Sequence, residues 1–274
     1  MRADIAGTDP QIQLEYELSG PAAGEVVVFI RGLGTQMIEW PEEFLQSFHA
    51  QGLRTLIFDN RDVGLSTKCE DEYSLKDMAG DVIGLLDHLT LSRAVIFGIS
   101  LGGMVAQLVA YHYPERVRAL FSVMSGSGNP DVPTVSADML PHLTRSAEGR
   151  DNVIRLSADN KVLFGSPGYP EDESERLAQA RAAYDRCYFP AGVARQMRAA
   201  NRDGSRVDRL RKIDVPTLVI HGADDALVNP AAGRDTADNI PGARFELVPG
   251  MGHNIPRSLA PRLAEVVLDF LKNL

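Results

Sequence analysis

The sequence predicts an α/β fold, in which a mostly parallel twisted sheet carries helices on both faces and a helical cap is inserted between its strands. Three observations predict it. Strand-like apolar runs alternate with helical patterns from residue 26 to residue 124, and this alternation resumes at residue 217. A long stretch without any strand pattern separates the two parts. A strand, a tight turn and a helix follow one another around Ser100.

Composition narrows the class of protein. The chain has 274 residues, of which 44% are hydrophobic, enough to build one large core with an inserted subdomain. The formal net charge is −9, whereas a protein that binds nucleic acid usually presents a basic face. Nucleic-acid binding is therefore not expected, and ordinary solubility explains the acidity.

The two cysteines, Cys69 and Cys187, form neither a disulfide framework nor a zinc-ligand spacing. We expect two reduced thiols in a cytoplasmic protein, although a single disulfide would also fit. The N-terminal residues lack an apolar signal region. The longest apolar stretch, 94–110, is interrupted by Ser100, three glycines and Gln107, so no membrane span is expected.

The first part of the chain supplies most of the sheet. Residues 12–18 alternate apolar and polar side chains, which indicates a half-buried strand at an antiparallel edge. Residues 26–30 are continuously apolar, as expected for a strand covered on both faces, and they lead into the glycine-rich loop 31–35. The elements expected next are a helix at about 40–51, a strand at 53–58, a polar loop at 59–66, a helix at 77–89, a strand at 94–98 and a strand at 117–124.

The pattern changes between about residues 130 and 212, where helical patterns at 141–160 and 173–201 replace strands. We therefore predict a core formed by residues 1–129 and 213–274 and a helical cap formed by 130–212. The second half of the cap is rich in cations, which suggests either an anion-attracting rim or a solvated helix face. These cations are Arg195, Arg198, Arg202, Arg206, Arg209, Arg211 and Lys212. The core resumes with strands at 217–220 and 244–248 and helices at 231–239 and 258–271.

Ser100 stands at the apex of the strand–turn–helix segment, with the spacing Gly-x-Ser-x-Gly. A serine hydroxyl becomes a nucleophile only when a base removes its proton, so it must stand clear of the backbone. A sharp turn flanked by glycines achieves this. The turn also directs the first N–H groups of the helix, beginning with that of Leu101, toward the space where an oxyanion would form.

A base and an acid for such a serine are present later in the chain. His253 lies in a glycine-flanked loop after the last predicted strand, and Asp224 and Asp225 follow the preceding strand. Ligands bind at the carboxyl ends of strands in an open parallel sheet, and all of these positions are such ends. The chain order is serine, acid, histidine.

With these residues in place, the sequence resembles the α/β-hydrolase superfamily from about residue 11 to residue 271. The motif 58–66, FDNRDVGLS, resembles the family's polar loop after its fourth strand, and the motif 247–253, LVPGMGH, resembles its histidine loop. Together with the motif 240–244, IPGAR, the histidine loop is most similar to the aclacinomycin methylesterase-like esterases.

The resemblance implies roles for the candidate residues. Ser100 would attack the carbonyl carbon, and His253 would take its proton and pass it to the leaving group. Asp225, three residues after Gly222, would orient the imidazole, because this spacing resembles that of the family, and Asp224 is the alternative acid. Among the other histidines, His221 is a distant candidate for a supporting role.

The resemblance also implies an oxyanion hole with a second donor beside Leu101. The N–H of Leu33 is the first choice and that of Gly34 the second. Arg31 stands where the family commonly has histidine. Arg31 could pair with Asp62, or it could act through the geometry of the loop alone.

The function predicted from these residues is hydrolysis of a carboxylic ester through an acyl-enzyme. A small-molecule ester or lactone is the expected partner. No phosphate-binding loop or metal cluster is present in the sequence, so neither cofactor nor metal is expected, and nothing indicates the oligomeric state. A lactonase, a carbon–carbon bond hydrolase or a peroxide-dependent perhydrolase would use the same three residues. The alternative of another class is a non-catalytic ligand-binding protein on the same scaffold.

Overall fold

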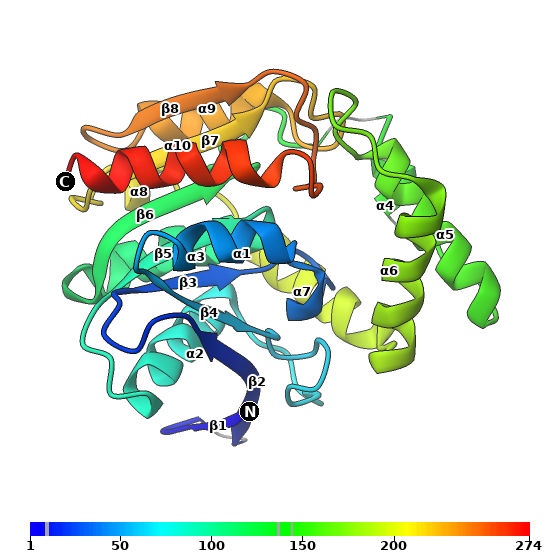
Figure 1. Ribbon diagram of the computed structural model, residues 1–274, viewed down its shortest axis with the longest axis horizontal. Helices are drawn as coiled ribbons and strands as arrows, with labels where there is room; N and C mark the ends of the chain where they lie inside the picture. The colour runs from blue at the N-terminus through cyan, green and yellow to red at the C-terminus, as the bar shows by residue number, and fades with distance from the viewer. Residues whose placement is uncertain (9–10, 136–137, 144) are drawn as a thin grey trace.

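The structure, a computed structural model, describes residues 1–8, 11–135, 138–143 and 145–274. It contains an eight-stranded sheet of order β1-β2-β4-β3-β5-β6-β7-β8, with helices on both faces (Figure 1). The α/β class predicted from the sequence is confirmed. The strands are β1 (Arg2–Ile5), β2 (Ile12–Ser19), β3 (Val26–Ile30), β4 (Arg54–Phe58), β5 (Ala94–Ile99), β6 (Val117–Val123), β7 (Thr217–Gly222) and β8 (Arg244–Val248).

The central strands are parallel, and β1 and β2 are antiparallel to their neighbours. Every residue of β3, β5 and β7 is buried, which explains why these strands have continuous apolar sequences. The prediction that residues 12–18 form an edge strand is wrong. The short strand β1, which the sequence pattern did not reveal, pairs with β2 and takes the edge.

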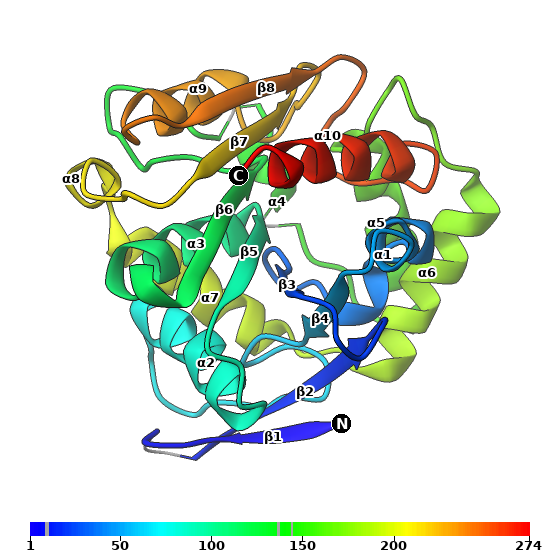
Figure 2. The ribbon, with the colours of Figure 1, turned by 60° about the vertical axis from the view of Figure 1, so that its left-hand side comes forward.

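Helices cover the sheet in two layers. α2 and α3 pack on one face, and α1 and α10 pack on the other (Figure 2). α3 begins directly after β5, so the turn between them lies at the carboxyl edge of the central strand. The helices of the core are α1 (Glu42–His49), α2 (Leu75–His88), α3 (Leu101–His112), α9 (Pro230–Asp238) and α10 (Ala260–Lys272), with 3-10 helices η1 (Met37–Glu39) and η2 (Pro114–Arg116).

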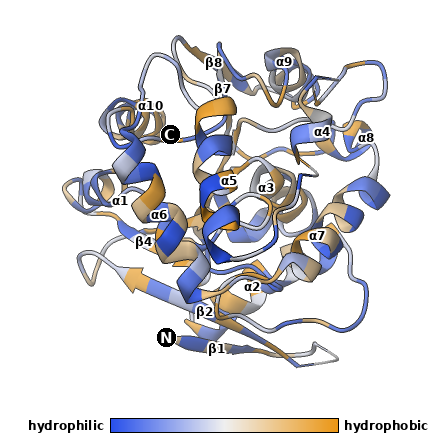
Figure 3. Cartoon of the chain, turned by 90° about the vertical axis from the view of Figure 1, so that its right-hand side faces the viewer, coloured by the Kyte–Doolittle hydropathy of each residue, from blue (hydrophilic) through white to orange (hydrophobic). Residues whose placement is uncertain are grey.

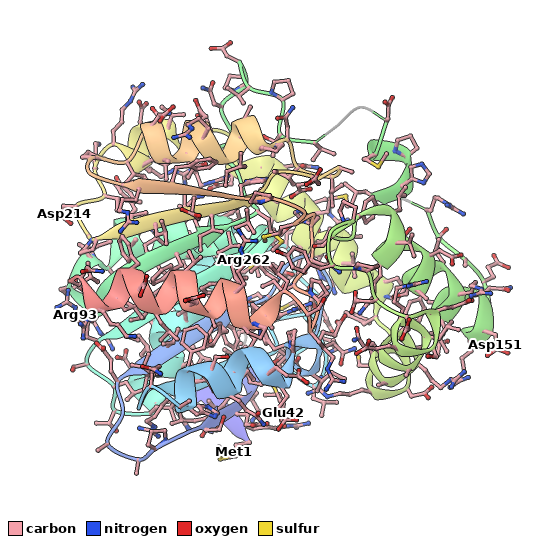
Figure 4. The ribbon with its side chains drawn as sticks, turned by 45° about the horizontal axis from the view of Figure 1, so that its top comes forward. Met1, Glu42, Arg93, Asp151, Asp214 and Arg262 are labelled. Carbon is pink, nitrogen blue, oxygen red and sulfur yellow. The ribbon has the colours of Figure 1, made fainter. Side chains whose placement is uncertain are left out.

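The cap is helical and lies at the carboxyl ends of the strands. Arg93 and Asp214, which precede β5 and β7, lie at the end of the molecule opposite to Asp151 of the cap (Figure 4). In Figure 3, which faces the cap, α5 and α6 carry long hydrophilic stretches. The helices between β6 and β7 are α4 (Leu140–Leu143), α5 (Arg150–Leu163), α6 (Glu173–Arg186), α7 (Pro190–Asp203) and α8 (Val207–Leu210).

Two predicted helices of the cap are each divided. The segment 141–160 contains the end of α4 and most of α5, with residue 144 outside the described residues. The segment 173–201 is interrupted before Pro190, which becomes the first residue of α7. Proline fits the first turn of a helix but disfavours the helical conformation in the residue before it, and Phe189 is correspondingly non-helical. Within the described residues, no helix combines the length and apolar character needed to cross a bilayer.

Candidate active site

Ser100 occupies a strained turn between β5 and α3. Its backbone has φ 54° and ψ −121°, a combination that costs a non-glycine residue of order 1–3 kcal/mol. The turn is tight enough to require glycine on both sides. A Cβ at Gly98 would overlap the Gly102 carbonyl, and a Cβ at Gly102 would overlap the Ile30 carbonyl. Close packing of the backbone at the two glycines therefore holds Ser100 in a conformation that is unfavourable for serine itself.

Ser100, His253 and Asp225 form one hydrogen-bonded chain. Ser100 Oγ lies 3.0 Å from His253 Nε2, and His253 Nδ1 lies 2.7 Å from Asp225 Oδ2. The carboxylate only accepts, so we assign the proton of the neutral imidazole to Nδ1. Nε2 then carries the lone pair that faces the serine hydroxyl, which is the tautomer that a general base requires.

Asp225 is held by its own loop as well. Its side chain is fully buried, and its Oδ1 accepts hydrogen bonds from the N–H groups of Leu227 and Val228 at 2.9 and 2.8 Å. Burial alone would raise the pKa of Asp225. The charge and hydrogen bond of His253, together with hydrogen bonds from His221 and Val228, outweigh burial and hold that pKa well below its usual range. The acid therefore stays ionised beside the imidazole.

Asp224, the alternative acid, faces a different direction. It is exposed, and its Oδ2 accepts a hydrogen bond from Gly250 N–H at 2.8 Å. The chain turns at Ala223 and Asp224, directly after β7, and only the carboxylate of Asp225 reaches the histidine. In this structure Asp224 stabilises the start of the histidine loop, and Asp225 contacts His253.

The loop after β3 lies against the serine. A Cβ at Gly32 would lie 3.2 Å from the Ser100 Cβ. Within the described part of the chain, the N–H groups of Leu33 and Leu101 donate no hydrogen bond to protein acceptors, whereas Gly34 N–H donates to Gln196 Oε1 at 2.9 Å. The structure therefore leaves the two amides chosen from the sequence available and engages the second-choice donor, Gly34.

The side chain of Arg31 stabilises the same loop through hydrogen bonds and a contact with Trp40. Its Nε donates to Thr35 Oγ1 at 3.2 Å, its Nη1 donates to the Glu39 carbonyl at 3.3 Å, and its guanidinium stacks over Trp40. The suggested pair with Asp62 is wrong, because Asp62 binds Arg195 of the cap instead. Arg31 thus acts through loop geometry, the second of the two possibilities.

His221 is a second imidazole beside the acid. Its Nε2 lies 3.0 Å from the Val228 carbonyl and 3.3 Å from Asp225 Oδ2. Both neighbours accept, so Nε2 carries the proton. Its Nδ1 is buried without a hydrogen-bond partner among the described residues. The only feature of the sequence that indicated a role for His221 was its position four residues before Asp225.

The cap contributes backbone support that no sequence signal revealed. His253 N–H donates to the Phe164 carbonyl at 2.7 Å, and Gly252 N–H donates to Ser166 Oγ at 2.9 Å. These partners lie in the segment between α5 and α6, far away in sequence. The histidine loop is therefore held between the sheet and the cap.

The cations in the second half of the cap do not all belong to an anion-attracting rim, nor do they all belong to a solvated helix face. Arg195 pairs with buried Asp62 at 2.8 Å, and Arg206 is itself buried, with Gln107 Oε1 at 2.8 Å. These cations fasten the cap to the core. The part of the chain that the structure describes holds no group of three or more metal-ligating side chains, and both cysteines are free.

Comparison with known proteins agrees with this fold. Residues 25–256 match the family of the alpha/beta hydrolase fold. The chain belongs to this family. It is 27% identical to rhodomycin D methylesterase from Streptomyces peucetius over 284 residues, covering 95% of each chain. It is 25% identical to 3-oxoadipate enol-lactonase 2 from Acinetobacter baylyi over 241 residues, covering 88% of this chain and 86% of the relative.

A solved structure with a similar fold is that of the enol-lactonase from Burkholderia xenovorans LB400. It superposes with a TM-score of 0.81 at 25% sequence identity, over 99% of this chain and 100% of that one. The predicted resemblance to α/β hydrolases, and to methylesterases of the aclacinomycin type among them, is therefore confirmed.

Proposed function

We propose that this protein is a serine hydrolase that cleaves a carboxylic ester of a small or medium-sized molecule through an acyl-enzyme intermediate. One observation carries the proposal. An unbroken hydrogen-bonded chain runs from Ser100 through His253 to the buried Asp225, and the nearby amides of Leu33 and Leu101 donate to no acceptor among the described residues. This arrangement supplies a nucleophile, a base, an orienting charge and donors for an oxyanion.

The reaction follows from the atoms in place. Ser100 Oγ attacks the ester carbonyl carbon while His253 Nε2 takes its proton. The carbonyl oxygen becomes an oxyanion that the N–H groups of Leu33 and Leu101 stabilise, each by about 3–4 kcal/mol. His253 then gives its proton to the departing alkoxide, and the acyl group stays on Ser100.

Water then removes the acyl group by the same kind of steps, with water as the nucleophile and Ser100 as the leaving group. His253 takes a proton from the water, hydroxide adds to the acyl carbon, and collapse of the second tetrahedral intermediate returns the proton to Ser100. Asp225 remains ionised throughout and stabilises the imidazolium that forms twice in each cycle. No external cofactor takes part in any of these steps.

The class of substrate is supported by the named relatives, a methylesterase and an enol-lactonase. A lactone is a cyclic ester and would pass through the same intermediates, so lactone hydrolysis is the second candidate. Carbon–carbon bond hydrolysis and non-catalytic binding remain the alternatives that an assay must separate from ester hydrolysis.

The test is hydrolysis of p-nitrophenyl esters of increasing acyl length by the wild type and by Ser100→Ala. We expect turnover by the wild type and a loss of about 10⁴-fold or more in Ser100→Ala. Ser92→Ala, which alters an exposed loop serine, is the matched control and should keep full activity. Circular dichroism should show that all three proteins are folded, and the preferred acyl length measures the acyl pocket.

Normal turnover by Ser100→Ala would contradict the assignment of the nucleophile. If the wild type releases no p-nitrophenol, the same pair of proteins should be assayed with γ- and δ-lactones. Serine-dependent opening of a lactone would favour the second candidate. Inactivity toward both classes would favour the carbon–carbon hydrolase or the binding protein.

A further inference from the structure

Gln196 of the cap helix α7 bridges two loops of the core. Its side chain is fully buried. The amide oxygen accepts a hydrogen bond from Gly34 N–H at 2.9 Å, and the amide nitrogen donates to the Arg61 carbonyl at 3.1 Å. The two partners fix the orientation of the amide, because a backbone N–H only donates and a carbonyl only accepts.

The Arg61 end of this bridge is immobilised. The Arg61 guanidinium donates to both carboxylate oxygens of Asp81, at 2.6 and 2.7 Å, and the two side chains are 8% and 3% exposed. A bidentate pair of this kind holds both position and direction. Gln196 therefore ties the loop after β3 to a rigid point rather than to another flexible segment.

The Gly34 end is closely covered by the same helix. Gly34 has φ +65°, and a Cβ at this position would lie 2.8 Å from Val193 Cγ2. Val193 and Gln196 are three residues apart on α7 and so share one face of the helix. That face both packs against Gly34 and binds its amide.

These contacts determine the direction of the neighbouring Leu33 amide. Leu33 N–H shares a peptide plane with the Gly32 carbonyl, which accepts a hydrogen bond from Thr35 Oγ1 at 3.0 Å. The next peptide plane contains Gly34 N–H, which Gln196 holds. Both planes that flank Leu33 are thus fixed, one by the loop itself and the other by the cap.

We propose that Gln196 is a positioning residue for the oxyanion hole: by binding Gly34 N–H, it holds the loop so that Leu33 N–H meets the oxyanion. The inference rests on the proposed function. Gln196 acts through the loop and does not contact the reacting atoms. The cap would then contribute to stabilisation of the transition state and not only to the choice of substrate.

A purely structural role, in which Gln196 only fastens the cap, predicts different behaviour. Arg198 lies on the same helix and donates to Glu72 at 2.6 Å, and these side chains are 51% and 42% exposed. Arg198→Met therefore removes one fastening of α7 without touching the loop after β3. It is the matched control for Gln196→Met, which keeps the length of the side chain but removes both hydrogen bonds.

The first readout is steady-state kinetics with the best p-nitrophenyl ester. Loss of a whole oxyanion donor costs about 10²–10³ in kcat, and a displaced donor should cost less, so we expect about a tenfold lower kcat in Gln196→Met. KM should change by less than about threefold, because the interaction is made in the transition state. Arg198→Met should retain the wild-type kcat and KM.

The second readout is the affinity for a trifluoromethyl ketone analogue of that ester. Addition of Ser100 Oγ to the ketone carbon, with its proton taken by His253, places a hemiketal oxyanion in the oxyanion hole. The inhibition constant should rise in Gln196→Met by about the same factor as kcat falls, since both report the same donor. Unchanged kcat and inhibition constant, or equal losses in Arg198→Met, would overturn the proposal.

The third readout does not depend on turnover. Amide hydrogen exchange at Gly34 should be faster in Gln196→Met than in the wild type and unchanged in Arg198→Met. Unchanged exchange in Gln196→Met would overturn the proposal as well. If Gln196→Met does not fold, the smaller Gln196→Ala replaces it in all three measurements. Absence of Ser100-dependent turnover in the wild type would instead overturn the proposed function.

Discussion

The core and the cap of this molecule are stabilised by different kinds of contact. In the core, strands and helices bury two continuous apolar clusters, one on each face of the sheet. Between α5 and α6 of the cap, the apolar cluster is small: Ile154, Ala158 and Ala180 are buried, and the partly buried Leu177 and Tyr184 pack against them. Hydrophilic residues occupy long stretches of both helices (Figure 3).

Buried polar pairs attach the cap to the core, in addition to an apolar contact in which Phe164 and its cap neighbours pack against Leu227 and Val228. Arg186 binds Asp59 at 2.7 Å, and Arg195 binds Asp62 at 2.8 Å, with both carboxylates fully buried. Gln36 Nε2 of the core donates to the Ala183 carbonyl of α6 at 2.6 Å. Such polar contacts are directional, so they fix the orientation of the cap on the core as well as its distance from the core.

The comparison shows that the two regions share the site unequally. The reacting side chains belong to the core, at the ends of β5, β7 and β8. The cap holds the backbone of two loops of the site: Phe164 binds the histidine loop at His253, and Gln196 binds the loop after β3 at Gly34. Three predictions test this division, from the largest effect to the smallest.

Asp225→Asn should have the largest effect, because it alters the core's own catalytic chain. An asparagine can donate its N–H to the imidazole and favour the wrong tautomer, so we expect kcat to fall about 10⁴-fold. Asp224→Asn is the matched control and should change kcat by less than about threefold, since Asp224 contacts Gly250 rather than the histidine. Steady-state kinetics of both variants check the prediction, and the reverse ranking would move the acid to Asp224.

Asp62→Asn should weaken the attachment of the cap. It leaves Arg195, which is 11% exposed, without its counter-ion, and breaking a buried pair from one side costs about 3 kcal/mol. We expect urea unfolding to report a loss of this order and limited proteolysis to cleave the cap helices sooner. Glu72→Gln disrupts the exposed pairs with Arg198 and Arg202, each worth at most about 1 kcal/mol, so it should change both quantities much less than Asp62→Asn. Equal stability of the two variants would contradict a cap fastened by buried ions.

The smallest expected effect is a difference in reactivity between the thiols of Cys69 and Cys187. Burial, with the nearby Asp62 charge, raises the pKa of the Cys69 thiol to about 11, so at pH 8 about one molecule in a thousand carries the thiolate there. Cys187, at the end of the cap helix α6, is partly exposed. We expect iodoacetamide at pH 8 to modify Cys187 first and Cys69 only at higher pH or after unfolding. Peptide mass mapping checks this, and equal rates would contradict the burial of Cys69.

Much of the core could be predicted from the sequence because local patterns encode it. Continuous apolar runs mark β3 and β5, and glycines on both sides of Ser100 mark a turn that no larger residue fits. The short strand β1 escaped prediction because four residues carry too little pattern. The chain order of serine, acid and histidine also indicated the site, and the spacing from Gly222 favoured Asp225 while leaving Asp224 as the alternative.

The attachment of the cap could not be predicted, because it depends on pairs of residues that only the fold brings together. Gln196 and Gly34 are separated by 162 positions. A glutamine in an amphipathic helix gives no sign of whether it faces solvent or a buried amide. For the same reason Arg195 could be placed on a cationic face but not opposite Asp62.

The measurement that tests the account most directly is capture of the acyl-enzyme. Wild type and Ser100→Ala are mixed with a p-nitrophenyl ester, quenched in acid within seconds and digested, and the peptides are weighed. The account predicts that the mass of the acyl group appears on the peptide that contains Ser100 in the wild type and on no peptide in the variant. Release of p-nitrophenol by the wild type with the acyl group on another residue, such as Cys187, would contradict it.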